Sequence, residues 1–199
     1  MSLYNPPAFR EERLAVLLPI MQAPRLAVLA CQGPAGVPSL SHLPLLTDGR
    51  RVVGHLARAN GQVAALRAAG RAIAVWTGAE GYVSPSAYAS KREHGKVVPT
   101  WNYEAVHAEG PVEIIEDAAR LRSIVTELTI RHESGRPDPW AVEDAPEPFI
   151  QAQLKGIVGM VLTIETLTGK RKLSQNRPEA DRDGVRAQAA PELRAAMER

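Results

Sequence analysis

Five short segments place polar and aromatic groups within otherwise apolar stretches of the chain, where those groups could contact a bound molecule. The segments are SHLPLL (41–46), GHLARAN (54–60), YVSPSAY (82–88), PTWNY (99–103) and KLSQN (172–176). Buried hydroxyl, amide and imidazole groups need hydrogen-bond partners, which come either from the core or from a ligand. Aromatic rings beside such polar groups suit a flat heterocyclic cofactor better than nucleophilic catalysis.

The segment GHLARAN predicts a site for an anion. A strand ends here, Arg58 supplies a permanent planar charge, and a helix begins at Asn60. The amides of a helix N-terminus and a nearby guanidinium together bind a phosphate. The alternative is a solvated Arg58 beside an Asn60 that only caps the helix. Lys172 of KLSQN is a second candidate for the phosphate contact.

His42 and His55 lie on strands that a short turn should make antiparallel neighbours, so we expect them to line one pocket. There they could hydrogen-bond to the polar edge of a heterocycle. A metal or haem site is the alternative, but no ligand spacing such as HExxH supports a metal. The sequence contains no glycine-rich dinucleotide fingerprint, P-loop or Gly-x-Ser-x-Gly elbow, and no acid, base or nucleophile stands out. Whether the chain is an enzyme therefore stays open.

The elements that carry these segments are mainly antiparallel strands. Strand-like runs at 25–31, 36–46 and 50–57 are separated by turns, which predicts a meander. The run NGQVAALRAAG predicts a short helix that Asn60 caps and Gly70 ends. The strongest helix pattern lies at 116–133, and 157–174 predicts two final strands or one long bent strand. Because the strands come in hairpins, we expect a closed or nearly closed barrel with a few helices, rather than a doubly wound parallel sheet.

Length and composition fit a protein with one main core. The 199 residues carry a formal net charge of +2 and one cysteine, Cys31, which excludes an internal disulfide framework. No apolar run approaches the roughly 20 residues that span a bilayer, and the N-terminus has acids where a signal peptide has Lys or Arg. We therefore expect a cytoplasmic protein without membrane contact, with one domain at 1–176 and a charged surface helix or tail at 177–199.

Taken in order along the chain, these segments resemble the PaiB family of FMN-binding proteins, which are described as negative transcriptional regulators. YNPPAF (4–9) matches the start of the family pattern, and the five segments follow in the family's order as far as Asn176. The resemblance implies a mixed α and β fold that is mainly antiparallel β, an FMN-binding split β-barrel with peripheral helices. It also implies a homodimer with FMN near the subunit interface. Gly61 stands where the family usually has proline, and Ala87 where it usually has tryptophan.

Within this resemblance, PTWNY forms one wall of the flavin site. Trp101 and Tyr103 alternate to one face of their strand, where they could meet the cofactor or the partner subunit, and Asn102 points to the other face. An interface strand without a ligand is the alternative. No metal ligand is expected, and the cofactor-binding residues that the resemblance implies are Ser41, His42, Leu43, Pro44, His55, Ala57, Arg58, Asn60, Trp101, Asn102, Tyr103, Lys172, Ser174 and Gln175.

Three functions follow from these features: an FMN-binding transcriptional regulator, a flavin-dependent oxidoreductase acting on a small substrate, and a haem-binding split-barrel protein. The sequence contains no helix-turn-helix or zinc module, and its basic run is only KRK at 170–172. DNA is therefore a candidate partner that no motif supports.

Overall fold

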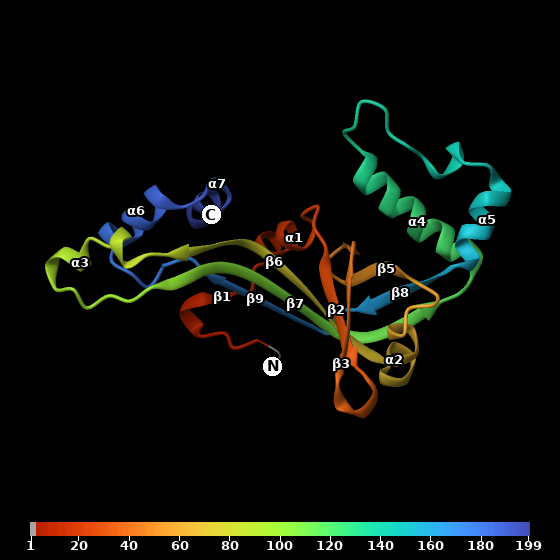
Figure 1. Cartoon of the computed structure of the whole chain (residues 1–199), viewed down its shortest axis with the longest axis horizontal. Coiled ribbons are helices and arrows are strands. Elements are labelled where there is room, and N and C mark those ends of the chain that lie inside the picture. Colours follow the sequence, from red (N-terminus) through yellow and green to blue (C-terminus); the bar gives the residue numbers. More distant parts are fainter. Residues whose placement is uncertain (1–2) are drawn as a thin grey trace. The chain divides into compact units, whose positions relative to one another are not determined.

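The computed structural model describes residues 3–199, which divide into two compact units. Unit 1 comprises the chain up to Ile20 together with Thr77–His107 and Thr168–Arg199, and unit 2 comprises Met21–Trp76 and Ala108–Leu167. Two long strands, β6 (Arg71–Val83) and β7 (Thr100–Ile115), contribute to both units (Figure 1).

Unit 2 contains short strands whose pairings are antiparallel. They are β2 (Ala27–Gln32), β3 (Pro38–Leu43), β4 (Leu46–Thr47), β5 (Arg51–Ala57) and β8 (Ile157–Thr163). β2 lies between β3 and the first part of β6, and β5 lies between β4 and β8, which also pairs with the last part of β7. The turn between β4 and β5 contains Gly49 at a φ of 84°, a conformation that favours glycine. The hairpins expected from the sequence are therefore present.

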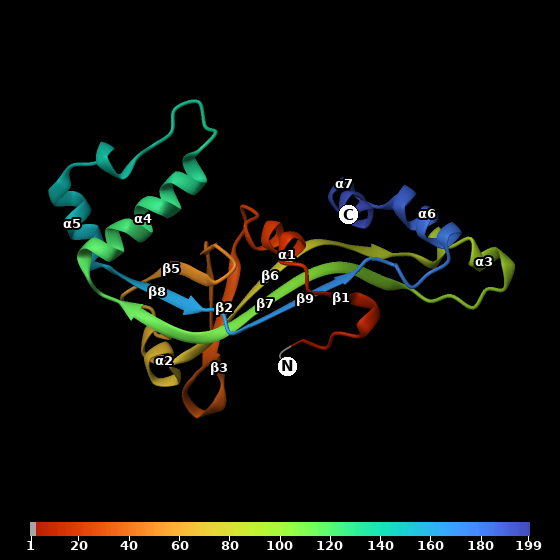
Figure 2. The ribbon, with the colours of Figure 1, turned by 180° about the vertical axis from the view of Figure 1, so that it is seen from behind.

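Three α-helices belong to unit 2: α2 (Gln62–Ala69), α4 (Ala118–Glu133) and α5 (Glu147–Lys155). Asp117 starts α4 by accepting a hydrogen bond from the Arg120 amide at 2.9 Å. Leu121, Ile124 and Leu128 recur at helical spacing and are buried in a core with residues of α5. Figures 1 and 2 show α4 and α5 side by side, and both helices contact β8.

Unit 1 is built on the last part of β6, the first part of β7 and most of the strand β9 (Thr166–Lys172). Its other elements are η1 (Pro7–Phe9), β1 (Arg10–Glu11), α1 (Leu14–Met21), η3 (Pro85–Ala87), α3 (Ser90–Glu93), α6 (Glu179–Gln188) and α7 (Pro191–Glu198). β9 pairs with both β1 and β7, and Arg10 lies opposite Lys170 in the antiparallel β1–β9 pair.

Residues 177–199, which we expected as a charged surface helix or tail, form the two helices α6 and α7. Val185 of α6 and Leu193 and Met197 of α7 are buried in one core with Val83 and Tyr88. Asp181 of α6 is buried too, and accepts hydrogen bonds from the Ser90 amide at 2.9 Å and the Ser90 hydroxyl at 2.7 Å. The apolar residues of the segment thus complete the core of unit 1.

A buried ion network joins several elements of unit 1. Arg171 Nε of β9 donates to Glu104 Oε1 of β7 at 2.8 Å, and Arg171 Nη1 lies 3.9 Å from Glu11 Oε2 of β1. Arg171 Nη2 also donates to the carbonyl of Ala196 in α7 at 2.6 Å. The Glu104 side chain is 1% exposed, and Arg199 Nη2 lies 3.3 Å from its Oε2. Each buried charge therefore has an opposite charge and hydrogen bonds beside it.

Two further expectations can be compared with the fold. The segment 157–174 forms two strands, β8 and β9, rather than one bent strand. The pairing of the two histidine-bearing strands was predicted wrongly, because β3 pairs with β2 and only the short β4 pairs with β5. No helix within residues 3–199 is long and apolar enough to cross a membrane.

Candidate functional site

The segment between β5 and α2 is held in place by Asn60. The Asn60 side-chain oxygen accepts a hydrogen bond from the Gln62 amide at 2.9 Å, and its Nδ2 donates to Ser41 Oγ of β3 at 3.0 Å. Gln62 is itself buried and donates to the carbonyls of Leu29 and Ser39, both at 2.8 Å. The start of α2 is thus fixed against β2 and β3. The N-cap residue of α2 is Gly61 rather than the expected Asn60, and Gly70 ends the helix as expected, at a φ of 64°.

Arg58 has a defined position at the end of β5. Its Nε donates to the Lys155 carbonyl at 2.9 Å and its Nη2 to the Ile157 carbonyl at 3.2 Å, while its Nη1 donates to Glu116. Arg67 of α2 approaches the same carboxylate, with Nη2 3.0 Å from Glu116 Oε2. The hydrogen bond from Arg58 and the charge of Arg67 lower the pKa of Glu116.

Two guanidinium groups therefore share one carboxylate, which leaves this group with a net charge of +1. The Arg58 and Arg67 side chains are 44% and 51% exposed, so an anion from solution can reach them. Three of the five N–H groups of the Arg58 guanidinium are engaged, and within residues 3–199 the remaining two have no hydrogen-bond partner.

The two histidines lie in different surroundings. His42 is exposed on β3, where it is paired with Val28 of β2. His55 on β5 lines a pocket of about 200 Å³ together with residues of α4 and α5. Burial lowers the pKa of His55, so its imidazole is neutral at pH 7. His42 is not among the residues that line this pocket.

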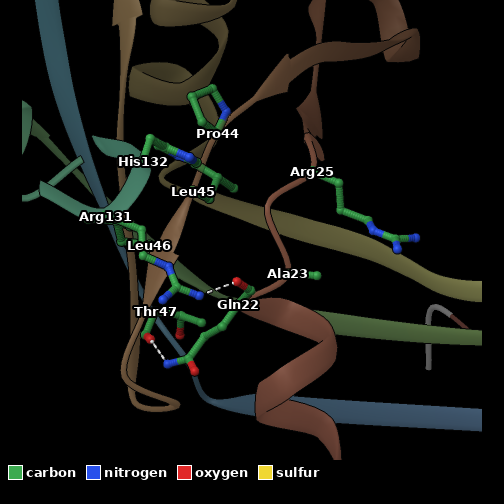
Figure 3. A pocket seen from close by; sticks show the side chains of 9 residues that line it. All are labelled: Gln22, Ala23, Arg25, Pro44, Leu45, Leu46, Thr47, Arg131 and His132. Carbon is green, nitrogen blue, oxygen red and sulfur yellow. Dashed lines mark hydrogen bonds between the residues drawn. The ribbon is translucent and has the colours of Figure 1, made fainter. Parts of the chain in front are cut away.

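Pro44 lines a smaller pocket, of about 130 Å³, with residues of the β2–β4 region and α4 (Figure 3). Arg131 Nη2 donates to the Gln22 carbonyl at 2.5 Å, and Gln22 Nε2 donates to the Thr47 carbonyl at 3.0 Å. Figure 3 shows these two hydrogen bonds closing one side of the pocket. Leu43 and Ala57, at the ends of β3 and β5, complete the predicted residues of unit 2.

The remaining predicted residues lie in unit 1, where PTWNY begins β7. Trp101 is 52% exposed, and its ring meets that of Tyr82 edge to face, with 6.3 Å between ring centroids. Asn102 is fully buried and shares hydrogen bonds with Ser174 Oγ at 3.0 and 3.1 Å. Tyr103 is half-buried, with Lys170 Nζ 5.2 Å from its ring centroid. The expected alternation of Trp101 and Tyr103 against Asn102 is confirmed.

KLSQN positions a second group of positive charge. Lys172 Nζ donates to the Trp101 carbonyl at 2.7 Å and to Thr100 Oγ1. Partial burial lowers the pKa of Lys172, and the charges of Lys170 and Arg177 lower it further. Gln175 is exposed, and its side-chain oxygen accepts a hydrogen bond from the Leu173 amide at 2.7 Å. Unit 1 thus has its own positively charged surface next to two aromatic rings.

The sequence reasoning missed the buried ion pair Glu104–Arg171, which links the strand that contains PTWNY to the strand that leads into KLSQN. Glu104 follows PTWNY directly and stands among apolar residues, and Arg171 directly precedes KLSQN. A charged residue inside such an apolar run was the signal for a buried ion pair. Within residues 3–199, no group of three His, Cys, Asp or Glu side chains could hold a metal ion.

FMN needs flat or aromatic walls for its ring system, hydrogen-bonding groups for the polar ring edge, and cations with amides for its phosphate. Unit 2 supplies the fixed Asn60 side chain for the polar ring edge and guanidinium groups whose charge exceeds that of their carboxylate for the phosphate, and unit 1 separately carries the exposed Tyr82–Trp101 pair. The donor set therefore fits this cofactor.

Comparison with known proteins agrees with this donor set. Residues 3–166 match the family model described as "Putative FMN-binding domain". The Bacillus subtilis protein named "Protease synthase and sporulation protein PAI 2" is 35% identical over 153 residues, which cover 73% of this chain and 70% of that protein. An uncharacterized Aspergillus fumigatus protein is 41% identical over 119 residues, 52% of this chain and 46% of that protein. The chain thus spans about half the length of the fungal relative.

Two solved structures share the fold. The "FAD and Heme binding protein" of Mycobacterium smegmatis has a TM-score of 0.62 at 18% identity, covering 82% of this chain and 73% of that one. The "Flavocytochrome Anf3" of Azotobacter vinelandii has a TM-score of 0.61 at 19% identity, covering 82% and 69%. The predicted fold class, a mainly antiparallel split barrel with helices, is confirmed, and so is FMN as the cofactor of the family.

Proposed function

Because this chain belongs to the family of putative FMN-binding domains and is similar to PAI 2 of Bacillus subtilis, we propose that it is a flavoprotein that holds the FMN phosphate at the segment between β5 and α2. The observation that carries the proposal is the excess positive charge there. Arg58 and Arg67 share the single carboxylate of Glu116 and stay about half exposed. A phosphate would offset the excess positive charge and accept hydrogen bonds from the guanidinium groups.

Each residue of this segment has a definite part in the proposal. Asn60 fixes the start of α2 against Ser41, so the helix amides and the Arg58 guanidinium keep a constant spacing. The carbonyls of Lys155 and Ile157 orient the Arg58 side chain and leave two of its N–H groups for the ligand. When bound, FMN supplies a ring system that accepts and releases electrons.

We assign the exposed ring pair Tyr82–Trp101 and the cation Lys172 to a subunit interface, which makes the working form a homodimer. Trp101 is 52% exposed although it is one of the largest apolar side chains in the protein. Large aromatic side chains with a polar tip are enriched where two proteins meet. In this arrangement Lys172 of one subunit is a second cation for the flavin site.

We also propose that the protein has a role in transcription and that it acts in the cytoplasm. In this proposal it acts through a protein partner rather than by direct contact with DNA. The name of PAI 2 refers to protease synthesis and sporulation in Bacillus subtilis. The net charge of +2 over 199 residues gives little attraction for nucleic acid. In a mobility-shift assay the chain alone should give no sequence-specific complex. A specific complex would replace the partner with direct DNA contact.

The test of the flavin proposal is a comparison of FMN with riboflavin, which lacks the phosphate. The purified full chain is titrated with each ligand, and binding is followed by quenching of flavin fluorescence. A charge-assisted phosphate contact contributes about 1.5–3 kcal/mol, so FMN should bind roughly tenfold to a hundredfold more tightly. Equal affinities would remove the phosphate assignment, and the absence of binding by both ligands would overturn the proposed function.

A further inference from the structure

The pocket that Pro44 lines is formed by the segment 22–25 before β2, the β3–β4 connection with β4, and the end of α4, all within unit 2 (Figure 3). It has a volume of about 130 Å³. An apolar cavity of about 150 Å³ is known to hold benzene, a molecule with six non-hydrogen atoms. By that comparison this pocket has room for a molecule of about five non-hydrogen atoms.

Part of the pocket wall is apolar. Ala23, Pro44 and Leu46 are half-buried, and Leu45 is 8% exposed. A ligand that places methyl or methylene groups on this wall removes apolar surface from water on both sides, and each CH₂ buried in this way strengthens binding by about threefold to fourfold. An inorganic ion would leave the apolar wall without such a contact. The wall therefore favours a ligand that has an aliphatic part.

The opposite part of the wall carries a positive charge that the pocket does not balance. Arg131 is exposed, and its guanidinium donates one hydrogen bond, from Nη2 to the Gln22 carbonyl at 2.5 Å. Among the described residues, the other four N–H groups of this guanidinium have no hydrogen-bond partner, and the side chain forms no ion pair. No Asp or Glu of the described chain lines the pocket. A guanidinium with two unpaired N–H groups can bind a carboxylate through two parallel hydrogen bonds.

His132 adds another donor beside Arg131. Its imidazole is exposed, lines the pocket and has no hydrogen-bond partner in the part of the chain that the structure describes. A neutral imidazole carries one N–H group, so it can donate to an oxygen of a ligand. The neighbouring carboxylate, Glu133, pairs with Arg136 at 3.4 Å and does not line the pocket. Arg25 is a further lining residue, and Figure 3 shows its side chain pointing away from Arg131 and His132.

We propose that this pocket binds a short aliphatic carboxylate of the size of propionate. The carboxylate accepts hydrogen bonds from Arg131 and His132, and the ethyl group lies against Ala23 and Leu45. The charge of the ligand balances that of Arg131, and its apolar part covers the apolar wall. The site is separate from the segment that we assign to the FMN phosphate and does not depend on that assignment. Pro44 is also one of the residues that the family resemblance implies for FMN, so FMN is tested as a competitor.

The binding experiment uses propionate as the probe and the imidazole resonance of His132 as the readout. The full chain, with carbon-13 in its histidines, is titrated with sodium propionate at constant pH and ionic strength, and His132→Gln identifies the resonance. We expect a saturable shift with a Kd on the order of 1 mM, while the resonance of His55, which lines another pocket, stays in place. Propionamide, an uncharged molecule of the same size, should bind about tenfold more weakly, and acetate, which is one methylene shorter, about threefold.

Two substitutions of Arg131 test its part in binding. Arg131→Gln should weaken propionate by about tenfold to a hundredfold, and Arg131→Lys, which keeps the charge without the planar fork, should weaken it less. The lysine variant carries the test if the glutamine variant does not fold. The matched control is Arg120→Gln, an exposed arginine of α4 that pairs with Glu113, and it should bind propionate like the wild type.

Propionate should bind equally with and without saturating FMN. Displacement by FMN would mean that the pocket belongs to the flavin site and would overturn the proposal. No saturable shift of the His132 resonance, equal affinity for propionamide or acetate, or unchanged binding by both Arg131 variants would each overturn it as well. None of these results would remove FMN binding itself.

Discussion

At the scale of single residues, the function of Arg58 depends on how its charge is shared. The sequence marks Arg58 as a phosphate ligand, and the structure shows the same side chain bound to two backbone carbonyls and to Glu116. If the N–H groups and the charge of this guanidinium were all paired within the protein, Arg58 would stabilise the fold and would have no charge left for a ligand. Arg67, which uses the same carboxylate, is what leaves positive charge for a ligand.

Replacing Arg58 with alanine tests this balance. We expect Arg58→Ala to weaken FMN by roughly tenfold to a hundredfold, because one charge-assisted contact to the phosphate is lost. Riboflavin should bind the variant and the wild type alike. Arg71→Ala is a matched control, since Arg71 is also exposed and pairs with a single glutamate, Glu165, at 2.7 Å. Equal weakening of both ligands would mean that Arg58 supports the fold, and the phosphate contact would then pass to Lys172.

At the scale of elements, the first residues of β7 determine the proposed dimer. Trp101→Ala removes an exposed ring and its edge-to-face contact with Tyr82, so we expect the dimer to dissociate at least tenfold more readily. Light scattering at a series of micromolar concentrations measures the change. Trp140→Ala, which removes an exposed tryptophan of unit 2, should leave the dimer intact. A wild-type protein that is monomeric with and without FMN would exclude this interface.

The contact between α6 and η3 lies at one departure from the family pattern. A Cβ at Gly184 of α6 would lie 1.9 Å from the carbonyl oxygen of Ala87, so helix and backbone touch directly. Ala87 stands where the resembled family usually has tryptophan, and a small residue there is compatible with the close approach of α6. The C-terminal helices thus occupy space beside η3 and close the core of unit 1.

This contact predicts that alanine substitutions at two glycines change the free energy of unfolding by very different amounts. Gly184→Ala should lower the free energy of unfolding by about 1–3 kcal/mol, because backbone must move to admit the methyl group. Gly61→Ala is the control, since a Cβ there meets nothing within 4 Å and the φ is −57°. That variant should be neutral or slightly stabilising. Urea unfolding of both variants measures the difference, and an unchanged Gly184→Ala would disprove the tight contact.

At the scale of the whole molecule, the ion network of unit 1 makes the free energy of unfolding decrease at low pH. Arg13 donates hydrogen bonds to Glu11 and, against the opposing effect of burial, holds the pKa of that carboxyl at about 2. Arg171 contributes a smaller lowering. In the unfolded chain the carboxyl titrates near its ordinary value of 4.5. The stabilisation is therefore complete above pH 4.5 and is lost as the pH falls toward 2.

Glu11→Gln should remove that acid dependence. We expect the variant to lose about 2 kcal/mol of stability at pH 7 and much less at pH 3, because the wild-type protein has already lost part of the same contribution there. Urea midpoints at the two pH values provide the measurement. Glu12→Gln is the control, because the Glu12 side chain is 79% exposed and should matter little at either pH. Parallel losses at both pH values would show that the charge of Glu11 is not responsible.

The sequence by itself determined the features that depend on near neighbours along the chain. Gly70 ends α2 as its sequence predicts, and alternation along β7 buries Asn102 while Trp101 stays exposed. Capping, turns and alternation are set by residues a few positions apart, so a sequence pattern reports them directly. The order of the six motifs, from Tyr4 to Asn176, was enough to indicate the family and its cofactor.

Only the tertiary structure decided which distant residues meet. It pairs β3 with β2, so His42 does not join His55, and it directs His55 to the pocket beside α4 and α5. It also brings Glu116 to Arg58 across 58 residues of sequence. Strand partners and ion pairs are chosen by packing of the whole chain, and many pairings are compatible with the same local pattern. The charge balance of the candidate phosphate site therefore could not be predicted from the motif that contains Arg58.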